Sequence, residues 1–134
     1  MNLTIRTDGG SRGNPGPAGI GVVIENADTQ EVLEKHAEFL GKTTNNQAEY
    51  KAVILGLQRA VVLGAETVEV VADSELLIRQ ARGEYRVKNP DLGLRFAEMK
   101  ALERKLKLVK YRHVRREFNK AADALANEAM DRGY

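Results

Sequence analysis

The spacing of apolar residues predicts three β-strands in the first third of the chain. Leu3 and Ile5 alternate with polar neighbours, which is typical of a half-buried strand. The predicted strands cover residues 2–8, 19–24 and 32–40. Glycine and proline are concentrated in residues 9–17, which favours a loop there, and residues 26–29 are typical of a turn. Connections this short predict an antiparallel meander of three strands.

The rest of the chain alternates helical periodicity with short β-branched runs. A first helix is expected after the capping side chains of residues 43–46; its apolar positions run from Ala48 to Leu63, and Gly64 ends it. Further helices are predicted over residues 74–82, 92–105 and 121–130, and further strands over residues 67–72 and 107–114. Residues 83–90 are expected to be a connector, and Asn119 is a candidate cap for the last helix.

This order of elements predicts an α/β fold. A strand that follows a long helix can join the first strand in parallel through a right-handed crossover. The expected architecture is a five-stranded mixed sheet, with a three-stranded antiparallel meander plus parallel strands, and helices on both faces. At 134 residues, the chain is expected to form one domain over residues 1–134.

Composition narrows the classes of site that the chain can hold. The absence of cysteine excludes disulfides and thiolate metal sites, and only two histidines, His36 and His113, are present. Any metal would therefore be held by oxygen ligands, which suits Mg²⁺ or Mn²⁺. No apolar run is long enough to span a membrane, and the N-terminal residues resemble a strand rather than a signal peptide. We expect a cytoplasmic monomer with no membrane partner and no small-molecule cofactor.

The net charge of +2 is modest, but basic residues are concentrated in one segment. This basic stripe consists of Arg104, Lys105, Lys107, Lys110, Arg112, Arg115, Arg116 and Lys120. Such a stripe can follow the phosphates of a nucleic acid. Alternatively, its cations belong to a solvated edge strand and prevent aggregation. The charges alone do not separate these two interpretations.

Four carboxylates are expected to meet at one edge of the predicted sheet. Asp8 ends the first strand and Asp73 ends the fourth, so parallel pairing of these strands places both at the same carboxyl edge. Glu49 and Asp123 lie in the first turns of two helices. Like charges packed together take up protons unless cations neutralise them. Two divalent metal ions would do this and would support in-line displacement at a phosphodiester.

Each acid also has a simpler explanation when taken alone. Asp8 could start a turn before the two glycines, and Glu49 or Asp123 could interact with a helix dipole. Asp73 and Ser74 could cap the following helix. The set of four acids together with their flanking residues is what favours the metal site.

Those flanking residues resemble the signature blocks of the type 1 ribonuclease H family. The matching segments are TDGGSRGNPG at residues 7–16, TNNQAE at 44–49, ADS at 72–74 and NKAADALA at 119–126. They occur in the order found in the family, and the resemblance covers essentially the whole chain. The first block is highly specific and the second adds strong support, whereas Asp-Ser alone would be weak.

The resemblance implies a ribonuclease H-like fold and roles for particular residues. Asp8 would bridge two metal ions, Glu49 and Asp73 would complete one metal site, and Asp123 would bind the second ion. Residues at three asparagine positions and in the glycine-containing segment would contact the substrate: Asn14, Asn45, Asn46, Gly9, Gly10 and Ser11. Glycine allows close approach of backbone to a ligand, and the 2′-hydroxyl distinguishes RNA from DNA.

The sequence departs from well-known members of the family before the last aspartate. Many of them carry a catalytic histidine on a flexible, glycine-containing loop there. His113 stands at a suitable spacing from Asp123, but no glycine follows it, so it could be held in the strand beside Tyr111. Arg116 is then an alternative candidate, as a cation that assists release of the leaving group or product.

Two further departures concern the middle of the chain. Glu75 stands where a glutamine is common, and it could lie near the metals or face solvent. The segment between Asp73 and Asp123 is short and the chain has no tryptophan, so the tryptophan-rich basic protrusion of some bacterial members is missing. These features resemble the compact archaeal and minimal bacterial branch. Hybrid binding would then depend more on the basic stripe.

The resemblance implies an endonuclease that cuts the RNA strand of an RNA–DNA hybrid and leaves a 5′-phosphate. Two alternatives remain open at this point. The same fold and metals could act on double-stranded RNA, or the chain could be a non-catalytic module that binds hybrids.

Overall fold

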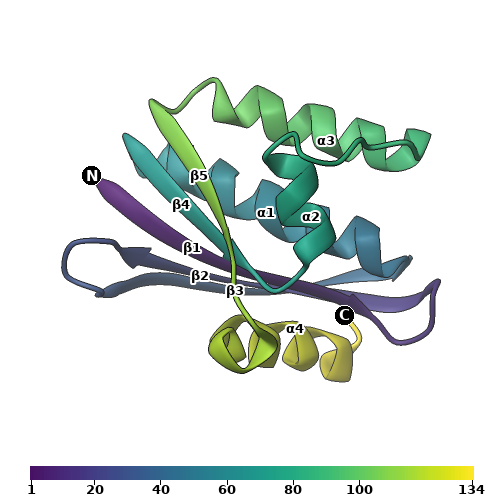
Figure 1. The fold of residues 1–134 in the computed structure, drawn as a ribbon. Coiled ribbons are helices and arrows are strands. Elements are labelled where there is room, and N and C mark those ends of the chain that lie inside the picture. The colour runs from purple at the N-terminus through teal and green to yellow at the C-terminus, as the bar shows by residue number, and fades with distance from the viewer.

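The computed structural model describes residues 1–134, which form one five-stranded sheet with helices on both sides (Figure 1). The strands are β1 (Asn2–Ser11), β2 (Gly16–Asn26), β3 (Val32–Thr43), β4 (Thr67–Ala72) and β5 (Leu108–His113). The helices are α1 (Asn45–Val62), α2 (Glu75–Ala81), α3 (Pro90–Glu103) and α4 (Lys120–Arg132), with a short 3-10 helix, η1 (Arg116–Phe118). The order of elements and the mixed sheet agree with the sequence prediction.

The strands lie in the order β3-β2-β1-β4-β5. The meander β1-β2-β3 is antiparallel, whereas β4 pairs in parallel with both β1 and β5. The β1–β4 register runs from Asn2 opposite Thr67 to Thr7 opposite Ala72. This register brings the carboxyl ends of the two parallel strands to the same level, as the sequence predicted.

The two faces of the sheet are covered unequally. Helices α1, α2 and α3 lie on one face, and α4 lies alone on the other, against β1, β2 and β3 (Figure 1). The main core lies under α1, where residues such as Ile5, Leu57 and Val70 are fully buried. Because the β-strand alternates its side chains, the neighbours of Ile5 along β1 point toward the α4 face.

Small residues bring α4 close to the sheet. A Cβ added to Gly21 of β2 would lie 2.1 Å from the carbonyl oxygen of Ala122 in α4. Ala122, Ala126 and Ala129 form the buried stripe of this helix. The absence of side-chain bulk on both sides therefore fixes the height of α4 above the sheet, and with it the position of Asp123.

The predicted loop over residues 9–17 is wrong at both of its ends. Strand β1 continues to Ser11 and β2 begins at Gly16, because their antiparallel pairing persists to Ser11 opposite Ala18. Of the two glycines that suggested a loop, Gly9 serves close packing instead: a Cβ there would lie 2.4 Å from the backbone of Ala48 in α1.

Two helix starts also differ from the prediction. Helix α3 begins at Pro90 rather than in the region of Leu92, since the Asn89 side chain accepts hydrogen bonds from the first turn and proline suits the first helical position. Asn119 precedes α4 but makes no capping hydrogen bond. Its side chain is buried and donates instead to the carbonyl oxygen of Thr7, 2.9 Å away. No helix of the structure is long and apolar enough to cross a lipid bilayer.

Candidate active site

Four separate elements bring the predicted carboxylates to one end of the β1–β4 pair. Asp8 follows Thr7, the last residue of β1 that pairs with β4, and Asp73 follows the last residue of β4. Glu49 comes from α1, one residue beyond its first turn, so it is not the helix-terminal charge that was one alternative. Asp123 lies in the first turn of α4. These four residues are far apart in the sequence, and only the fold brings them together.

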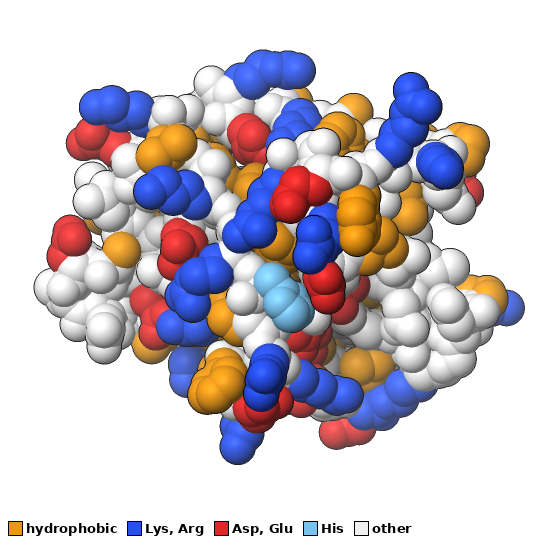
Figure 2. All heavy atoms as spheres, in the orientation of Figure 1, with side chains coloured by type: hydrophobic (Ala, Val, Ile, Leu, Met, Phe, Trp, Pro, Cys, Tyr) orange, Lys and Arg blue, Asp and Glu red, His pale blue; other side chains and the backbone are white.

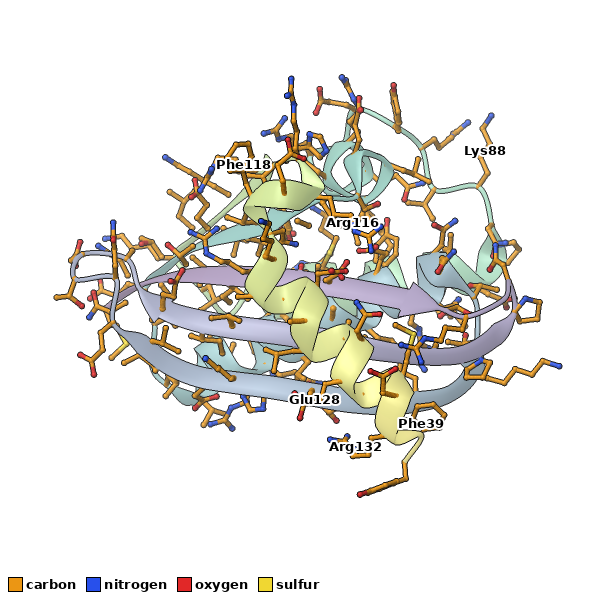
Figure 3. The ribbon with its side chains drawn as sticks, turned by 90° about the horizontal axis from the view of Figure 1, so that it is seen from below. Phe39, Lys88, Arg116, Phe118, Glu128 and Arg132 are labelled. Carbon is orange, nitrogen blue, oxygen red and sulfur yellow. The ribbon has the colours of Figure 1, made fainter.

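The carboxylates face a common cleft. Oxygens of Asp8, Glu49 and Asp73 all lie within 4.8 Å of one another. Asp123 stands beside this group, and its side chain hydrogen bonds with Asp8. All four acids line a cleft of about 540 Å³ that is open to solvent. In Figure 3, which views the molecule from the α4 side, carboxylate oxygens gather in front of the sheet near Arg116.

Burial and mutual repulsion make ionisation of this cluster costly. Burial, the neighbouring charge of Asp73 and a hydrogen bond with Asp123 together raise the pKa of Asp8 to about 8, and burial is the largest of these causes. Burial is also the main reason that the pKa of Glu49 lies well above its ordinary value, with Asp8 and Asp73 adding to it. The pKa of Asp73 is raised by burial, and the Arg116 cation opposes that shift.

The cluster fits a hard divalent cation. One oxygen of Glu49, Oε2, is buried and has no hydrogen-bond partner in the protein, although buried polar atoms normally have one. All the converging donors are carboxylate oxygens, which are the ligands that Mg²⁺ and Mn²⁺ prefer. A cation among them would satisfy the unpaired oxygen and would stabilise the charged forms of the three carboxylates, which burial and mutual repulsion disfavour.

The segment after Asp8 is held against the start of α1 by a chain of hydrogen bonds. The Ser11 backbone N–H donates to Asn45 Oδ1 at 2.7 Å, and the Asn45 backbone N–H donates to Asn14 Oδ1 at 3.1 Å. Ser11 Oγ donates to the carbonyl oxygen of Thr43 at 2.9 Å. Thr44 caps α1 with its side chain. These bonds fix the backbone of β1 and the first turn of α1 relative to each other.

Most of the predicted substrate-contact residues line the cleft. They are Gly9, Gly10, Ser11, Asn45 and Asn46. Asn14 does not line it, but its side-chain oxygen is bonded to the backbone of Asn45 at the rim.

The structure places His113 and Arg116, the two candidates for an assisting residue ahead of Asp123, differently relative to the cleft. His113 is the exposed last residue of β5; it does not line the cleft, but it lies opposite Ala72 and near enough to Asp73 to lower the pKa of that carboxyl. Arg116 does line it, and its Nη2 lies 3.2 Å from Asp123 Oδ1. The geometry therefore favours Arg116 as the cation at the site.

Three polar residues near the site were not among the site residues predicted from the sequence. Asn127 lines the cleft one helical turn after Asp123, a spacing that could have indicated it. Arg12 also lines the cleft; its Nη2 lies 2.6 Å from Asp131 and 3.4 Å from Asn127 Oδ1, so it ties the segment after β1 to α4. Asn119 follows η1 and connects it to β1 through the hydrogen bond to Thr7. No sequence signal distinguishes this contact from capping of α4.

The remaining predicted features lie outside the cleft. Glu75 forms an ion pair with Arg79 at 2.9 Å on the surface of α2, so it faces solvent rather than the acidic cluster. The basic stripe follows the edge strand β5, and within it Arg112 pairs with Glu69 at 3.2 Å. Figure 2 shows Lys and Arg side chains over β4 and β5 interleaved with Asp and Glu, not an unbroken basic surface. Only the end of the stripe around Arg116 borders the candidate site.

Comparisons with known proteins agree with this architecture. A family model described as reverse transcriptase-like matches residues 6–129. Bifunctional protein Rv2228c of Mycobacterium tuberculosis is 46% identical over 131 residues, which are 98% of this chain and 36% of that protein. The solved N-terminal RNase H domain of the same protein superimposes with a TM-score of 0.95 at 45% identity, covering 98% of this chain and 100% of that one.

Two further relatives carry ribonuclease H names. Ribonuclease HI of Halobacterium salinarum is 41% identical over 124 residues, which are 92% of this chain and 62% of that protein. LC11-RNase H1, solved in complex with an RNA/DNA hybrid, has a TM-score of 0.91 at 43% identity and covers 97% of each chain. The chain thus spans about a third of the mycobacterial relative and less than two thirds of the haloarchaeal one.

Proposed function

The chain belongs to the ribonuclease H family, and from this premise we propose that it is a metal-dependent endonuclease that hydrolyses the RNA strand of RNA–DNA hybrids. The observation that carries this proposal is the convergence of Asp8, Glu49 and Asp73 within 4.8 Å, beside Asp123, in an open cleft. Buried carboxylates with raised pKa values and an unpaired Glu49 oxygen form a site that is incomplete without cations.

The four carboxylates would hold two divalent ions, Mg²⁺ or Mn²⁺. Asp8 would contact both ions, Glu49 and Asp73 would complete one site, and Asp123 would complete the other. When bound, such a pair of ions activates a water molecule and stabilises the leaving oxygen of an in-line phosphodiester displacement, which leaves a 5′-phosphate on the product. The raised pKa values support this assignment, because they measure how strongly the site disfavours unneutralised charge.

The residues around the cleft would position the hybrid. Gly9 and Gly10 both line the cleft. Gly10 has no side chain to keep the RNA strand away, whereas the missing side chain of Gly9 lets this segment pack on α1. The amides of Asn45 and Asn46 can bond to backbone oxygens and base edges of the nucleic acid. Recognition of shape and of the 2′-hydroxyl predicts little preference for base sequence.

Arg116 would assist the reaction as a fixed positive charge. A guanidinium stays protonated at any ordinary pH, so it cannot act as a general base. It can stabilise negative charge that develops on the leaving group, and its distance of 3.2 Å from Asp123 supports this role. His113 is the second candidate for this role.

The similarity to LC11-RNase H1 supports a hybrid as the substrate over other duplexes, since that protein was solved in complex with an RNA/DNA hybrid. The test is cleavage of three end-labelled duplexes, an RNA–DNA hybrid, an RNA duplex and a DNA duplex, each with Mg²⁺, Mn²⁺ or a chelator. We expect cuts in the RNA strand of the hybrid alone, lost with chelator. Equal cleavage of the RNA duplex would transfer the proposal to double-stranded RNA. Hybrid binding without cleavage under either metal would leave a binding module and overturn the enzymatic proposal.

A further inference from the structure

Phe118 is a large aromatic residue that remains 67% exposed beside the candidate active site. It is the last residue of η1, whose first residue, Arg116, reaches Asp123. Figure 3 shows the side chains of Phe118 and Arg116 on different sides of η1, and only Arg116 lines the cleft. A single exposed apolar residue is common on protein surfaces, so exposure alone assigns no role. The surroundings of Phe118 are more informative.

The ring of Phe118 lies in a short segment that is rich in exposed cations. Arg115 and Arg116 precede it with side chains 80% and 76% exposed, and the exposed Lys120 follows it. The one acid in the segment, Glu117, lies 4.0 Å from Arg115, and Lys120 makes no ion pair. Arg115 and Arg116 each have an acidic partner but remain largely exposed, and Lys120 has none. An aromatic side chain among exposed cations is the combination with which proteins bind single-stranded nucleic acid.

The geometry of nucleic acids determines which partner suits this surface. Inside a duplex, each base is already stacked between its neighbours, so an exposed protein ring has no base face to contact. An unpaired base offers its face, and stacking on an aromatic ring tolerates any base. A strand that leaves the cleft past Arg116 reaches η1 next, because Arg116 borders the cleft and begins η1.

We propose that Phe118, with Arg115 and Lys120, binds an unpaired nucleotide of a strand that extends beyond the hybrid. The preferred substrate is then a hybrid joined to a single-stranded extension rather than a blunt hybrid. This inference rests on the proposed function, because it takes the cleft beside η1 as the place where the hybrid lies.

The test compares binding of two fluorescent hybrids, one blunt and one with an unpaired extension, by anisotropy. The Asp8→Asn protein is used throughout so that the RNA stays intact. We expect the extension to tighten binding by about 10-fold. Phe118→Ala should abolish most of that gain and leave the Kd for the blunt hybrid unchanged, whereas Phe118→Trp should retain it. Val62→Ala is the matched control, since Val62 is 68% exposed at the far end of α1.

Three results would overturn the inference: equal binding of blunt and extended hybrids by the parent, equal weakening of both by Phe118→Ala, or the same loss with Val62→Ala. If circular dichroism shows that Phe118→Ala is unfolded, Arg115→Gln replaces it in the test. This variant should weaken binding of the extended hybrid and not of the blunt one. The readout is binding, so it separates this inference from the proposed activity. A protein that cleaves extended and blunt hybrids but binds them equally would retain the activity and lose the role of Phe118.

Discussion

Asp8 is buried beside two other carboxylates, and its ionisation without a cation opposes folding. Its pKa rises from 3.8 to about 8 in the folded protein, so between these values the folded state binds more protons than the unfolded state. Its contribution to stability is therefore fully present below about pH 4 and is lost as the pH rises through about 8. This behaviour is opposite to that of a carboxylate in a stabilising ion pair.

The pH dependence can be measured with Asp8→Asn in the presence of a chelator. At about pH 8 the amide should raise the free energy of unfolding by on the order of 2 kcal/mol, because it removes a buried negative charge and its repulsion by Asp73, and near pH 4 the gain should vanish. Urea denaturation at both pH values provides the measurement, with the exposed Asp28→Asn as the control. If the gain in stability were equal at both pH values, the negative charge of Asp8 would not be its cause.

Arg116 and His113 differ in what their loss should do. Arg116→Gln removes a cation 3.2 Å from Asp123, so we expect single-turnover cleavage of a hybrid to slow by about 10- to 100-fold. His113→Gln should slow it by much less, because His113 lies outside the cleft. A larger effect of His113→Gln would mean that the strand end rearranges around the substrate.

At the scale of elements, the packing of α4 on β2 determines where Asp123 lies. Gly21→Ala would place a Cβ 2.1 Å from the Ala122 carbonyl oxygen, so either α4 or β2 must move. We expect a loss of about 1–3 kcal/mol of stability together with lower cleavage activity, as Asp123 moves with the helix. Gly93→Ala in α3 meets no atom within 4 Å and should instead stabilise by roughly 0.5–1 kcal/mol. Thermal melts and hybrid cleavage of both variants would test this, and unchanged activity in a destabilised Gly21→Ala protein would contradict it.

The sequence predicted the type and order of every α-helix and β-strand, but it missed some of their ends and the short 3-10 helix η1. Hydrophobic periodicity identifies a face of an element, and that face was read correctly along β1 and α1. The end of β1 was mispredicted because Gly9 and Gly10 have the composition of a loop, whereas Gly9 is in the strand and in close contact with α1. Composition cannot distinguish these two uses of glycine, because the contact is with residues that lie far along the chain.

For the candidate site, too, local sequence patterns predicted some features, whereas others depend on packing between distant parts of the chain. Strand ends and helix starts sufficed to predict that Asp8, Glu49, Asp73 and Asp123 would share one sheet edge, and the structure brings them together. The role of Asn119 depends on a hydrogen bond to Thr7 across 112 residues, which no local pattern contains. The contact between Arg12 and Asp131 likewise joins two ends of the chain that only the fold brings together.

At the scale of the whole molecule, the positions of the charged residues matter more than the net charge. A net charge of +2 gives little general attraction to nucleic acid, and four acids occupy the cleft itself. Under the proposed function, binding of a polyanion there would depend on metal cations in the cleft and on Arg116 at its rim. On β5, Arg112 is paired with Glu69, so we expect it to add less to this binding than an unpaired cation would.

The most direct test of the account is hybrid cleavage by the parent and by four single variants, Asp8→Asn, Glu49→Gln, Asp73→Asn and Asp123→Asn, in Mg²⁺. Glu75→Gln serves as the control, since Glu75 is an acid close in sequence to Asp73 but faces solvent beside Arg79. We predict that the four variants lose nearly all activity while remaining folded, and that the control cleaves like the parent. Full activity in Asp8→Asn, or a loss in Glu75→Gln as large as in the other four, would contradict the assignment of the reaction to this cleft.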